Sequence, residues 1–225
     1  MLIAGNVMSV ENEIVAELKS IFSDPRQETH EGVLVAGGFL TPELLEHAYR
    51  HGVFPWPHEG YPLLWFCPDE RGVIDFEDFH LPKSFIKWRK KYAADYAVTM
   101  NENFSEVVEH CRRVVRKGQN GTWINSEIVR NYTALFNRGK AFSVEIKKNE
   151  KLVGGIYGVK SELYWSCESM FHLEPNTSKL ALVTLIEYLQ QSGRSWVDIQ
   201  MVTSVCELFG GKLISKDEFL TRINC

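Results

Sequence analysis

Residues 152–200 decide the fold, because three blocks in this stretch carry the clearest patterns of the chain. The blocks are LVGGIYGV at residues 152–159, ELYWSCESMFHLEPNTSK at residues 162–179 and WVDIQ at residues 196–200. The first two blocks are apolar and rich in β-branched and aromatic residues, and the polar pair Lys160-Ser161 separates them. This pattern predicts a hairpin with a buried face. The third block alternates, which predicts another strand.

Three polar residues accompany these apolar strands. Glu168 lies in the sequence CESMF, where we expect the second strand to end. A carboxylate in that place is either satisfied within the fold or directed at a ligand. In the last strand, alternation puts Asp198 and Gln200 on one face and Val197 and Ile199 on the other. One face of that strand is therefore expected to present a carboxylate beside an amide.

A helix is expected between the second and third blocks. Thr177 or Ser178 can cap it, its apolar positions recur with a period of about 3.6 residues, and Gly193 can end it. A strand is also predicted at residues 142–146. From there the expected order is strand, strand, strand, helix, strand, helix, strand. This order favours an α/β or α+β domain on a mixed, mostly antiparallel sheet.

The composition limits the classes of protein that fit. With 225 residues, of which 44% are hydrophobic, the chain can form one large domain or two smaller ones. A net charge of −4 argues against a general nucleic-acid coat, so any RNA contact must come from a local patch. Five cysteines without C-x-x-C spacing argue against a zinc site and favour a reducing compartment. With no leader or membrane-span pattern, we expect a soluble cytoplasmic protein.

Two clusters of basic residues are candidates for such a patch. The first follows Pro82 on an expected helix and comprises Lys83, Lys87, Arg89 and Lys90, with Lys91 beside them. The second comprises Arg112, Arg113, Arg116 and Lys117. Taken alone, the first cluster is typical of a solvated surface helix. For the second, a solvated face and an RNA contact remain equally open.

Several motifs in one order give the chain a family resemblance. They are HGVFPWP, WFCPDERGV, GTWI, GGIYG, ESMF, N-x-SK and D-x-Q, and they extend over about residues 32–219. Together they resemble the leucyl/phenylalanyl-tRNA–protein transferase family. The resemblance implies a small N-terminal domain at residues 1–69. It also implies an acyltransferase domain like the GCN5-related N-acetyltransferases at residues 70–225.

The activity that the resemblance implies is transfer of Leu or Phe, with Met as a further candidate, from aminoacyl-tRNA to the N-terminal Lys or Arg of acceptor proteins. This modification would mark the acceptors for degradation through the N-degron pathway. The aminoacyl ester is already activated, so the main requirement is to align amine and ester while excluding water. No metal and no organic cofactor is expected, and we expect a monomer.

The resemblance assigns roles to the polar residues. The amide oxygen of Gln200 can accept a hydrogen bond from the attacking amine, as an orienting group and not a general base. Asp198 could attract the ammonium, fix the Gln200 amide and stabilise charge developing on nitrogen. The alternative for Asp198 is an ordinary carboxylate that caps a neighbouring helix. Glu168 is the candidate for binding the basic side chain of the acceptor.

The resemblance also points to substrate-binding residues. The apolar pocket for the donor side chain is expected from Ile156, Trp165, Leu185 and Val197, although each fits an ordinary core. In a family that uses tRNA, Lys83, Lys87, Arg89 and Lys90 become phosphate contacts, because grouped cations bind a polyanion by releasing counterions. Trp123 of GTWI joins them as an aminoacyl-tRNA contact.

Two other readings stay open from the sequence. A CoA-dependent N-acetyltransferase would need a glycine-rich cradle for pyrophosphate, and the turn at residues 171–178 has no glycine. A non-catalytic relative that binds aminoacyl-tRNA is motivated by the departure from the family pattern at Leu208–Gly211. Phe39 and Val205 are further departures, and their effect on activity stays open.

Overall fold

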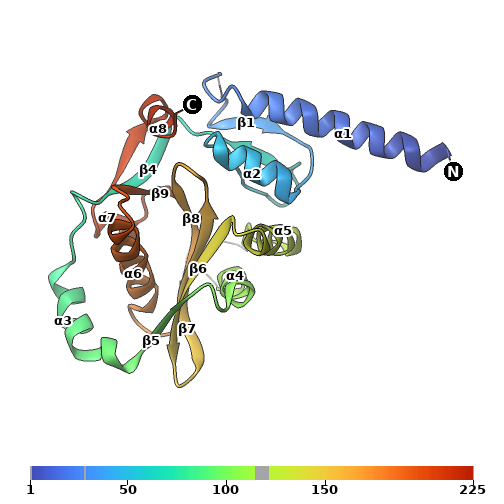
Figure 1. Ribbon diagram of the computed structural model, residues 1–225. Coiled ribbons are helices and arrows are strands. Elements are labelled where there is room, and N and C mark those ends of the chain that lie inside the picture. Colours follow the sequence, from blue (N-terminus) through green and yellow to red (C-terminus); the bar gives the residue numbers. More distant parts are fainter. Residues whose placement is uncertain (1, 28, 115–121, 225) are drawn as a thin grey trace. The chain divides into compact units, whose positions relative to one another are not determined.

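The computed structural model describes residues 2–27, 29–114 and 122–224 (Figure 1). The chain forms two compact units. Unit 1 comprises Met1–Glu70 with Ser215–Cys225, and unit 2 comprises Arg71–Ile214. Arg116 and Lys117 of the second basic cluster lie outside the described residues.

Unit 1 is a small sheet with helices. Its elements are α1 (Leu2–Phe22), β1 (Val33–Ala36), α2 (Pro42–Arg50), β2 (Phe54–Pro55), β3 (Leu64–Phe66) and α8 (Lys216–Arg222). The strands pair antiparallel in the order β1-β3-β2. The Trp65 side chain, which is fully buried, packs against Phe22 with ring centroids 4.8 Å apart. The indole and the end of α1 therefore form the centre of this core.

Helix α2 begins with a local sequence that favours a helix start. The Thr41 side chain accepts a hydrogen bond from the Leu44 backbone N–H at 3.1 Å, and Pro42 occupies the first turn. Past the helix, Gly52 has a φ of 78°, which favours glycine. A Cβ at Gly52 would also lie 2.7 Å from the Phe219 ring of α8. The close approach of these elements thus requires a glycine.

Unit 2 is larger and contains the stretch that decides the fold. Its strands are β4 (Glu70–Asp75), β5 (Ala97–Met100), β6 (Ala141–Lys148), β7 (Lys151–Lys160), β8 (Trp165–His172), β9 (Trp196–Gln200) and β10 (Gly211–Ser215). Its helices are α3 (Lys83–Tyr92), the short 3-10 helix η1 (Ala93–Asp95), α4 (Phe104–Arg113), α5 (Ser126–Asn137), α6 (Thr177–Gln191) and α7 (Ser204–Glu207). The predicted order from residue 142 onward is confirmed.

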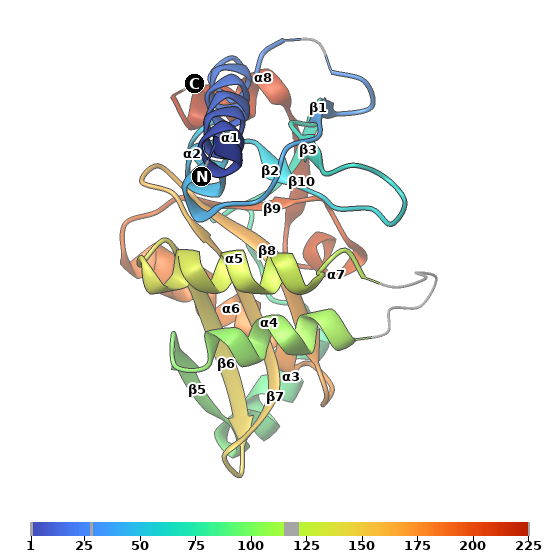
Figure 2. The same cartoon turned by 90° about the vertical axis from the view of Figure 1, so that its right-hand side faces the viewer.

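In the described residues the strands of unit 2 form one sheet, in the order β10-β4-β9-β8-β7-β6-β5. The pair β8–β9 is parallel, and the pairs β4–β9, β5–β6, β6–β7 and β7–β8 are antiparallel. The prediction of a mixed, mostly antiparallel sheet is therefore confirmed. Helix α6 covers one face of the sheet, and α4 and α5 cover the other (Figures 1 and 2).

The main core of unit 2 lies between the sheet and α6. Buried side chains of α6 there include Leu182, Leu185, Ile186 and Leu189, which repeat at helical spacing. Strand β7 approaches α6 closely, because a Cβ at Gly154 would lie 2.5 Å from the Thr177 Cβ. This glycine of the GGIYG motif is thus explained by packing against the first turn of α6.

No helix among the described residues is both long and apolar enough to cross a membrane.

Candidate functional site

Two irregularities in the central strands direct the polar side chains. Strand β8 runs on to His172, so the expectation that the strand ends at Glu168 is wrong. Opposite β7, Ser169 pairs with Tyr157 and Cys167 with Gly158, so Glu168 is the extra residue of a β-bulge. A bulge re-aims a side chain without ending the strand. Bulges are common beside active sites.

The second irregularity lies in β9, beside β4. Gly72 pairs with Gln200 and Val73 with Asp198, which leaves Ile199 as the extra residue. Gln200 itself has a φ of 59°, in the left-handed region that residues other than glycine rarely adopt. The strand thus ends in a tight turn with Gln200, which carries the amide side chain, at its centre.

A buried ion pair joins β4 to β9. Arg71 is 1% exposed and Asp198 is 0% exposed. Arg71 donates from Nε to Asp198 Oδ1 at 2.9 Å and from Nη2 to Asp198 Oδ2 at 2.8 Å. Oδ1 also accepts the backbone N–H of Gln200 at 2.9 Å. Each carboxylate oxygen of Asp198 therefore has a protein donor.

Gln200 and Glu168 are brought together across β8 and β9. Gln200 Nε2 donates to Glu168 Oε1 at 2.9 Å and lies 3.4 Å from Ser166 Oγ. The Ser166 hydroxyl also donates to Glu168 Oε1 at 3.3 Å, and the Tyr132 hydroxyl of α5 lies 3.5 Å from Glu168 Oε2. A carboxylate only accepts, so the amide presents its NH₂ to Glu168 and turns its oxygen away.

The cluster of Arg71, Asp198, Gln200, Glu168, Ser166 and Tyr132 can do three things chemically. Its amide oxygen can orient a donor such as an amine. Its half-buried carboxylate, Glu168, is an anion and can attract a cation. Its buried ion pair can hold the backbone beneath both groups. We call this set the polar cluster.

Asp198 was expected either to attract the ammonium and fix the Gln200 amide, or to cap a neighbouring helix. Asp198 holds the backbone N–H of Gln200, whereas the side-chain amide of Gln200 is held by Glu168. The Asp198 side chain is fully buried against Arg71. Its contacts thus lie within the protein and not at a surface open to an amine.

The four residues expected to bind the donor side chain lie together on the α6 side of the sheet. Ile156, Leu185 and Val197 are at most 2% exposed and belong to the main core, against which the half-buried Trp165 packs. Trp165 contacts Phe142, with ring centroids 4.6 Å apart. The polar cluster lies on the opposite face, because Ser166 and Asp198 alternate with these apolar neighbours.

The backbone pairing between β8 and β9 is short. The register of β8 and β9 consists of Ser166 opposite Asp198, with no further pair in the described chain. The backbone pairing of the two strands ends there, and Glu168 and Gln200 follow the pair by two residues on their respective strands. The apolar residues of the α6 side and the polar cluster therefore flank one position in the sheet.

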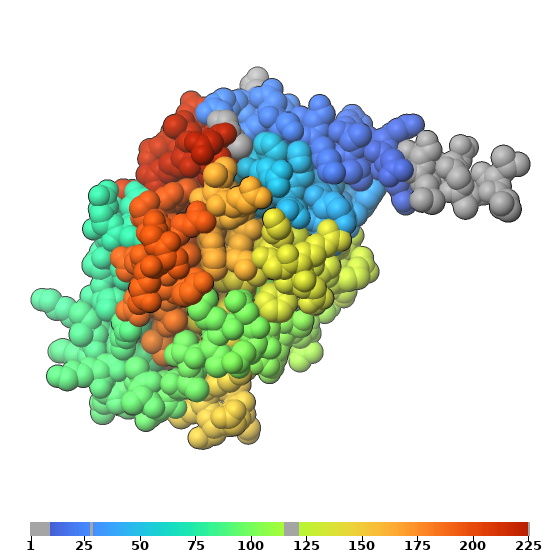
Figure 3. All heavy atoms as spheres, in the orientation of Figure 1, coloured from blue at the N-terminus to red at the C-terminus, as the bar shows by residue number. Residues whose placement is uncertain are grey.

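The first basic cluster lies on α3, which runs beside α6 (Figure 3). Lys83, Lys87 and Lys90 are exposed. Arg89 instead donates from Nη1 and Nη2 to Glu187 of α6, at 2.6 and 2.9 Å, and this carboxylate raises the pKa of Arg89. The lysines are thus open to a polyanion, whereas Arg89 already has an anionic partner.

The other basic and aromatic candidates lie on α4 and before α5. Arg112 and Arg113 both pair with Glu109 of α4, at 3.5 and 2.8 Å. Trp123 is half-buried just before the cap of α5, where Asn125 accepts the backbone N–H of Ile128 at 2.9 Å. Trp123 thus lies just before the helix that carries Tyr132 of the polar cluster.

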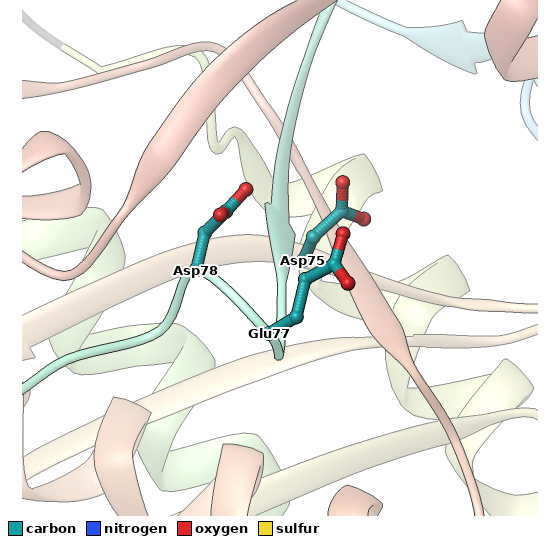
Figure 4. Close-up of side chains that lie close together, drawn as sticks. All are labelled: Asp75, Glu77 and Asp78. Atoms are coloured by element: carbon teal, nitrogen blue, oxygen red, sulfur yellow. The ribbon is translucent and has the colours of Figure 1, made fainter.

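A group of acidic residues follows β4 (Figure 4). Ligand atoms of Asp75, Glu77 and Asp78 lie within 4.8 Å of one another. Lys212 Nζ lies 2.9 Å from Asp75 Oδ2 and 2.6 Å from Asp78 Oδ2, and these carboxylates raise the pKa of Lys212 well above its usual range. The group therefore already has a cation, which the protein itself supplies.

Arg71, Ser166 and Tyr132 are members of the polar cluster that the sequence did not identify. Ser166 alternates with apolar residues two positions before Glu168, and Tyr132 lies on α5, distant in sequence from both strands. Arg71 stands directly before Gly72-Val73-Ile74, and a charge at the start of such a run needs a partner of opposite charge only if the run is buried, which the sequence alone does not show.

Fold and cluster together define a mixed α/β protein with a hydrogen-bonded polar cluster at the centre of its sheet. The family model for leucyl/phenylalanyl-tRNA protein transferase matches residues 73–224, and the model for the N-terminal domain of that family matches residues 38–69. The chain belongs to the leucyl/phenylalanyl-tRNA–protein transferase family, as the motifs predicted.

Relatives with that name agree along most of their length. The protein of Flavobacterium johnsoniae is 41% identical over 204 residues, which cover 90% of this chain and 95% of the relative. That of Lawsonia intracellularis is 41% identical over 192 residues, covering 85% and 83%. A solved GCN5-related N-acetyltransferase-like protein from Streptococcus suis matches at 16% identity over 77% of this chain and 64% of its own. Its TM-score is 0.37.

The buried ion pair leads to a prediction about stability. Replacing Arg71 with Met leaves Asp198 buried without its cation, so we expect the free energy of unfolding to fall by about 3–5 kcal/mol. The control is Arg113→Met in the same unit, which removes an exposed pair and should cost at most about 1 kcal/mol. Urea unfolding of both variants measures the difference. Equal losses would contradict a dominant role for the buried pair.

Proposed function

We propose that this protein transfers Leu or Phe, with Met as a further candidate, from aminoacyl-tRNA to the α-amine of proteins that begin with Lys or Arg, and that it acts as a monomer in the cytoplasm. Family membership supports the reaction type. The observation that carries the proposal is the contact between Gln200 and Glu168 beside the place where the pairing of β8 and β9 ends. An amide oxygen and a carboxylate there suit a substrate with both an amine and a basic side chain.

The reaction forms one bond and breaks one. The amine nitrogen attacks the ester carbon, the peptide C–N bond forms, and the C–O bond to the terminal ribose breaks. The departing ribose oxygen gains a proton, and the amine loses one through water or a ribose hydroxyl. With an unperturbed pKa of about 7.7–8.0, part of the α-amine is neutral at neutral pH. Alignment of amine and ester can then supply roughly 7–11 kcal/mol.

Each group of residues has a proposed task. Gln200 accepts a hydrogen bond from the amine, and Glu168 binds the basic side chain of the acceptor. Ile156, Trp165, Leu185 and Val197 surround the donor side chain, which enters where the pairing of these strands ends. Lys83, Lys87 and Lys90 bind tRNA phosphates, with Trp123 as a further contact.

The cysteines support the reducing compartment. Cys67, Cys111, Cys167 and Cys206 are buried. Burial raises the pKa of the Cys167 and Cys206 thiols, which keeps them protonated and unreactive.

The direct test offers charged tRNA to the purified protein together with a peptide that begins with Arg. We expect a product longer by one Leu or Phe residue, and no product from the same peptide with an acetylated N-terminus, because the acetyl group removes the attacking amine. Binding of charged tRNA without any product would favour the non-catalytic alternative. Turnover of acetyl-CoA in its place would favour an N-acetyltransferase.

Acceptor choice tests Glu168. Glu168→Gln keeps the size of the side chain but removes the charge, so we expect the preference for N-terminal Arg over Ala to fall. A charged hydrogen bond of about 1.5–3 kcal/mol corresponds to roughly a 10–100-fold loss in that ratio of kcat/KM. The control is Glu106→Gln, a change of an exposed carboxylate on α4. If Glu168→Gln distinguishes Arg from Ala as well as the parent does, the basic side chain binds elsewhere.

Salt dependence tests the lysines of α3. Replacing Lys83 and Lys87 with Ala should weaken all charged tRNAs alike, because phosphates carry no information about the esterified amino acid. The slope of log affinity against log salt should become shallower by up to about 0.9 for each lost contact on a duplex stem. Arg89→Gln should change the slope less, because Glu187 already binds this guanidinium.

Trp165→Phe is the control for the lysine variants, because it changes the proposed donor pocket and no charge. A change in an apolar pocket is worth roughly 1–3 kcal/mol and involves no counterions. We therefore expect Trp165→Phe to alter the ratio of Leu to Phe transfer while the salt slope stays unchanged. A double lysine variant that alters donor preference and leaves the slope as it was would remove α3 from the tRNA site.

A further inference from the structure

Asp198 is placed to act through its neighbours and not by touching a substrate. Its side chain has no exposed surface. Oδ1 accepts from Arg71 Nε and from the Gln200 backbone N–H, and Oδ2 accepts from Arg71 Nη2. An amine that approached Asp198 would have to displace a bidentate guanidinium from a dry site. The contribution of Asp198 must therefore pass through the groups that it holds.

The group that depends most on Asp198 is the backbone of Gln200. A φ of 59° is unfavourable for Gln and persists only where the surroundings enforce it. Two hydrogen bonds enforce it here. Asp198 Oδ1 accepts the Gln200 N–H at 2.9 Å, and the Ile199 carbonyl accepts the Met201 N–H at 2.6 Å. This conformation carries the Gln200 side chain to within 2.9 Å of Glu168.

Arg71 fixes the carboxylate from the other side. Its guanidinium is planar and meets both oxygens in a fork, which sets the rotation of the carboxylate as well as its place. Oδ1 is shared between Arg71 Nε and the Gln200 N–H, so the orientation that the fork imposes is also the one that the backbone needs. Arg71, Asp198 and Gln200 thus form a chain of hydrogen bonds from β4 to the polar cluster.

We propose that Arg71 is a positioning residue for the transfer reaction, which acts through Asp198 and the backbone of Gln200 to aim the Gln200 amide at the acceptor amine. This role rests on the proposed function. It predicts that a positive charge at position 71 is not sufficient for the normal rate of transfer. A Lys would neutralise Asp198 but, as a single ammonium, would not impose the fork.

The test compares Arg71→Lys with a matched control. Arg194→Lys breaks a second two-pronged arginine contact in the same unit, where Nη1 and Nη2 donate to the carbonyls of Leu163 and Glu162 at 2.7 and 3.1 Å. Both variants keep the positive charge. Three quantities are measured: hydrogen exchange at the Gln200 amide, the Kd for charged tRNA, and the single-turnover rate of transfer to an Arg peptide at saturation.

We expect Arg71→Lys to speed exchange at the Gln200 amide about tenfold while amides of β6 and β7 stay protected. Transfer should slow by roughly tenfold to a hundredfold, the effect of a small misplacement of reacting groups, with the Kd for charged tRNA unchanged. Arg194→Lys should leave all three quantities at the parent values. This combination would support positioning.

Other outcomes overturn the proposal. Normal transfer by Arg71→Lys, beside an active parent, would show that charge alone suffices. Faster exchange throughout the sheet, in proportion to lost stability, would show a merely structural role. If the parent transfers nothing, the proposed function fails, while a local change at the Gln200 amide still reports on the positioning chain. Should Arg71→Lys not fold, the neutral double variant Arg71→Gln with Asp198→Asn replaces it, and retention of the parent rate would overturn the role of the arginine.

Discussion

The contact between Arg71 and Asp198 is the constraint on which the centre of unit 2 depends. It joins residues that are 127 positions apart, and both side chains are buried. Removing either charge from water costs several kcal/mol, and their attraction offsets that cost only when the geometry is good and the remaining acceptors are satisfied. The two-pronged contact and the Gln200 N–H meet both conditions. The contacts that offset the cost of burying the two charges also fix the end of β9.

Much of the fold could be predicted, because local signals in this chain agree with the tertiary structure. Thr41 and Pro42 mark the start of α2, and the alternating blocks around residues 152–200 mark the strands that form the centre of the sheet. Strand β4 was not predicted. Its residues Arg71 to Asp75 include two charges and a glycine, so their pattern does not resemble a strand until the partner of each charge is known. That information lies in β9 for Arg71 and in β10 for Asp75, and it is not local.

The candidate site was predicted less completely than the fold. Glu168, Asp198 and Gln200 were identified, and the structure brings Glu168 and Gln200 into contact. The two bulges were not, because a bulge depends on the register between strands and has no signature in either strand alone. The two bulges determine which polar atoms of Glu168, Asp198 and Gln200 come into contact. With strict alternation Asp198 would stand beside the Gln200 amide, whereas the observed turn gives Asp198 the backbone N–H and gives the amide to Glu168.

The arrangement of two faces has a consequence for specificity in the proposed reaction. The apolar residues lie on the α6 side of the sheet and the polar cluster on the other, and both flank the point where the pairing of β8 and β9 ends. In the proposed reaction the donor would therefore contact the apolar residues and the acceptor would contact the polar cluster. A change of size at Ile156 or Leu185 can alter which donor fits and still leave the chain from Arg71 to Gln200 in place.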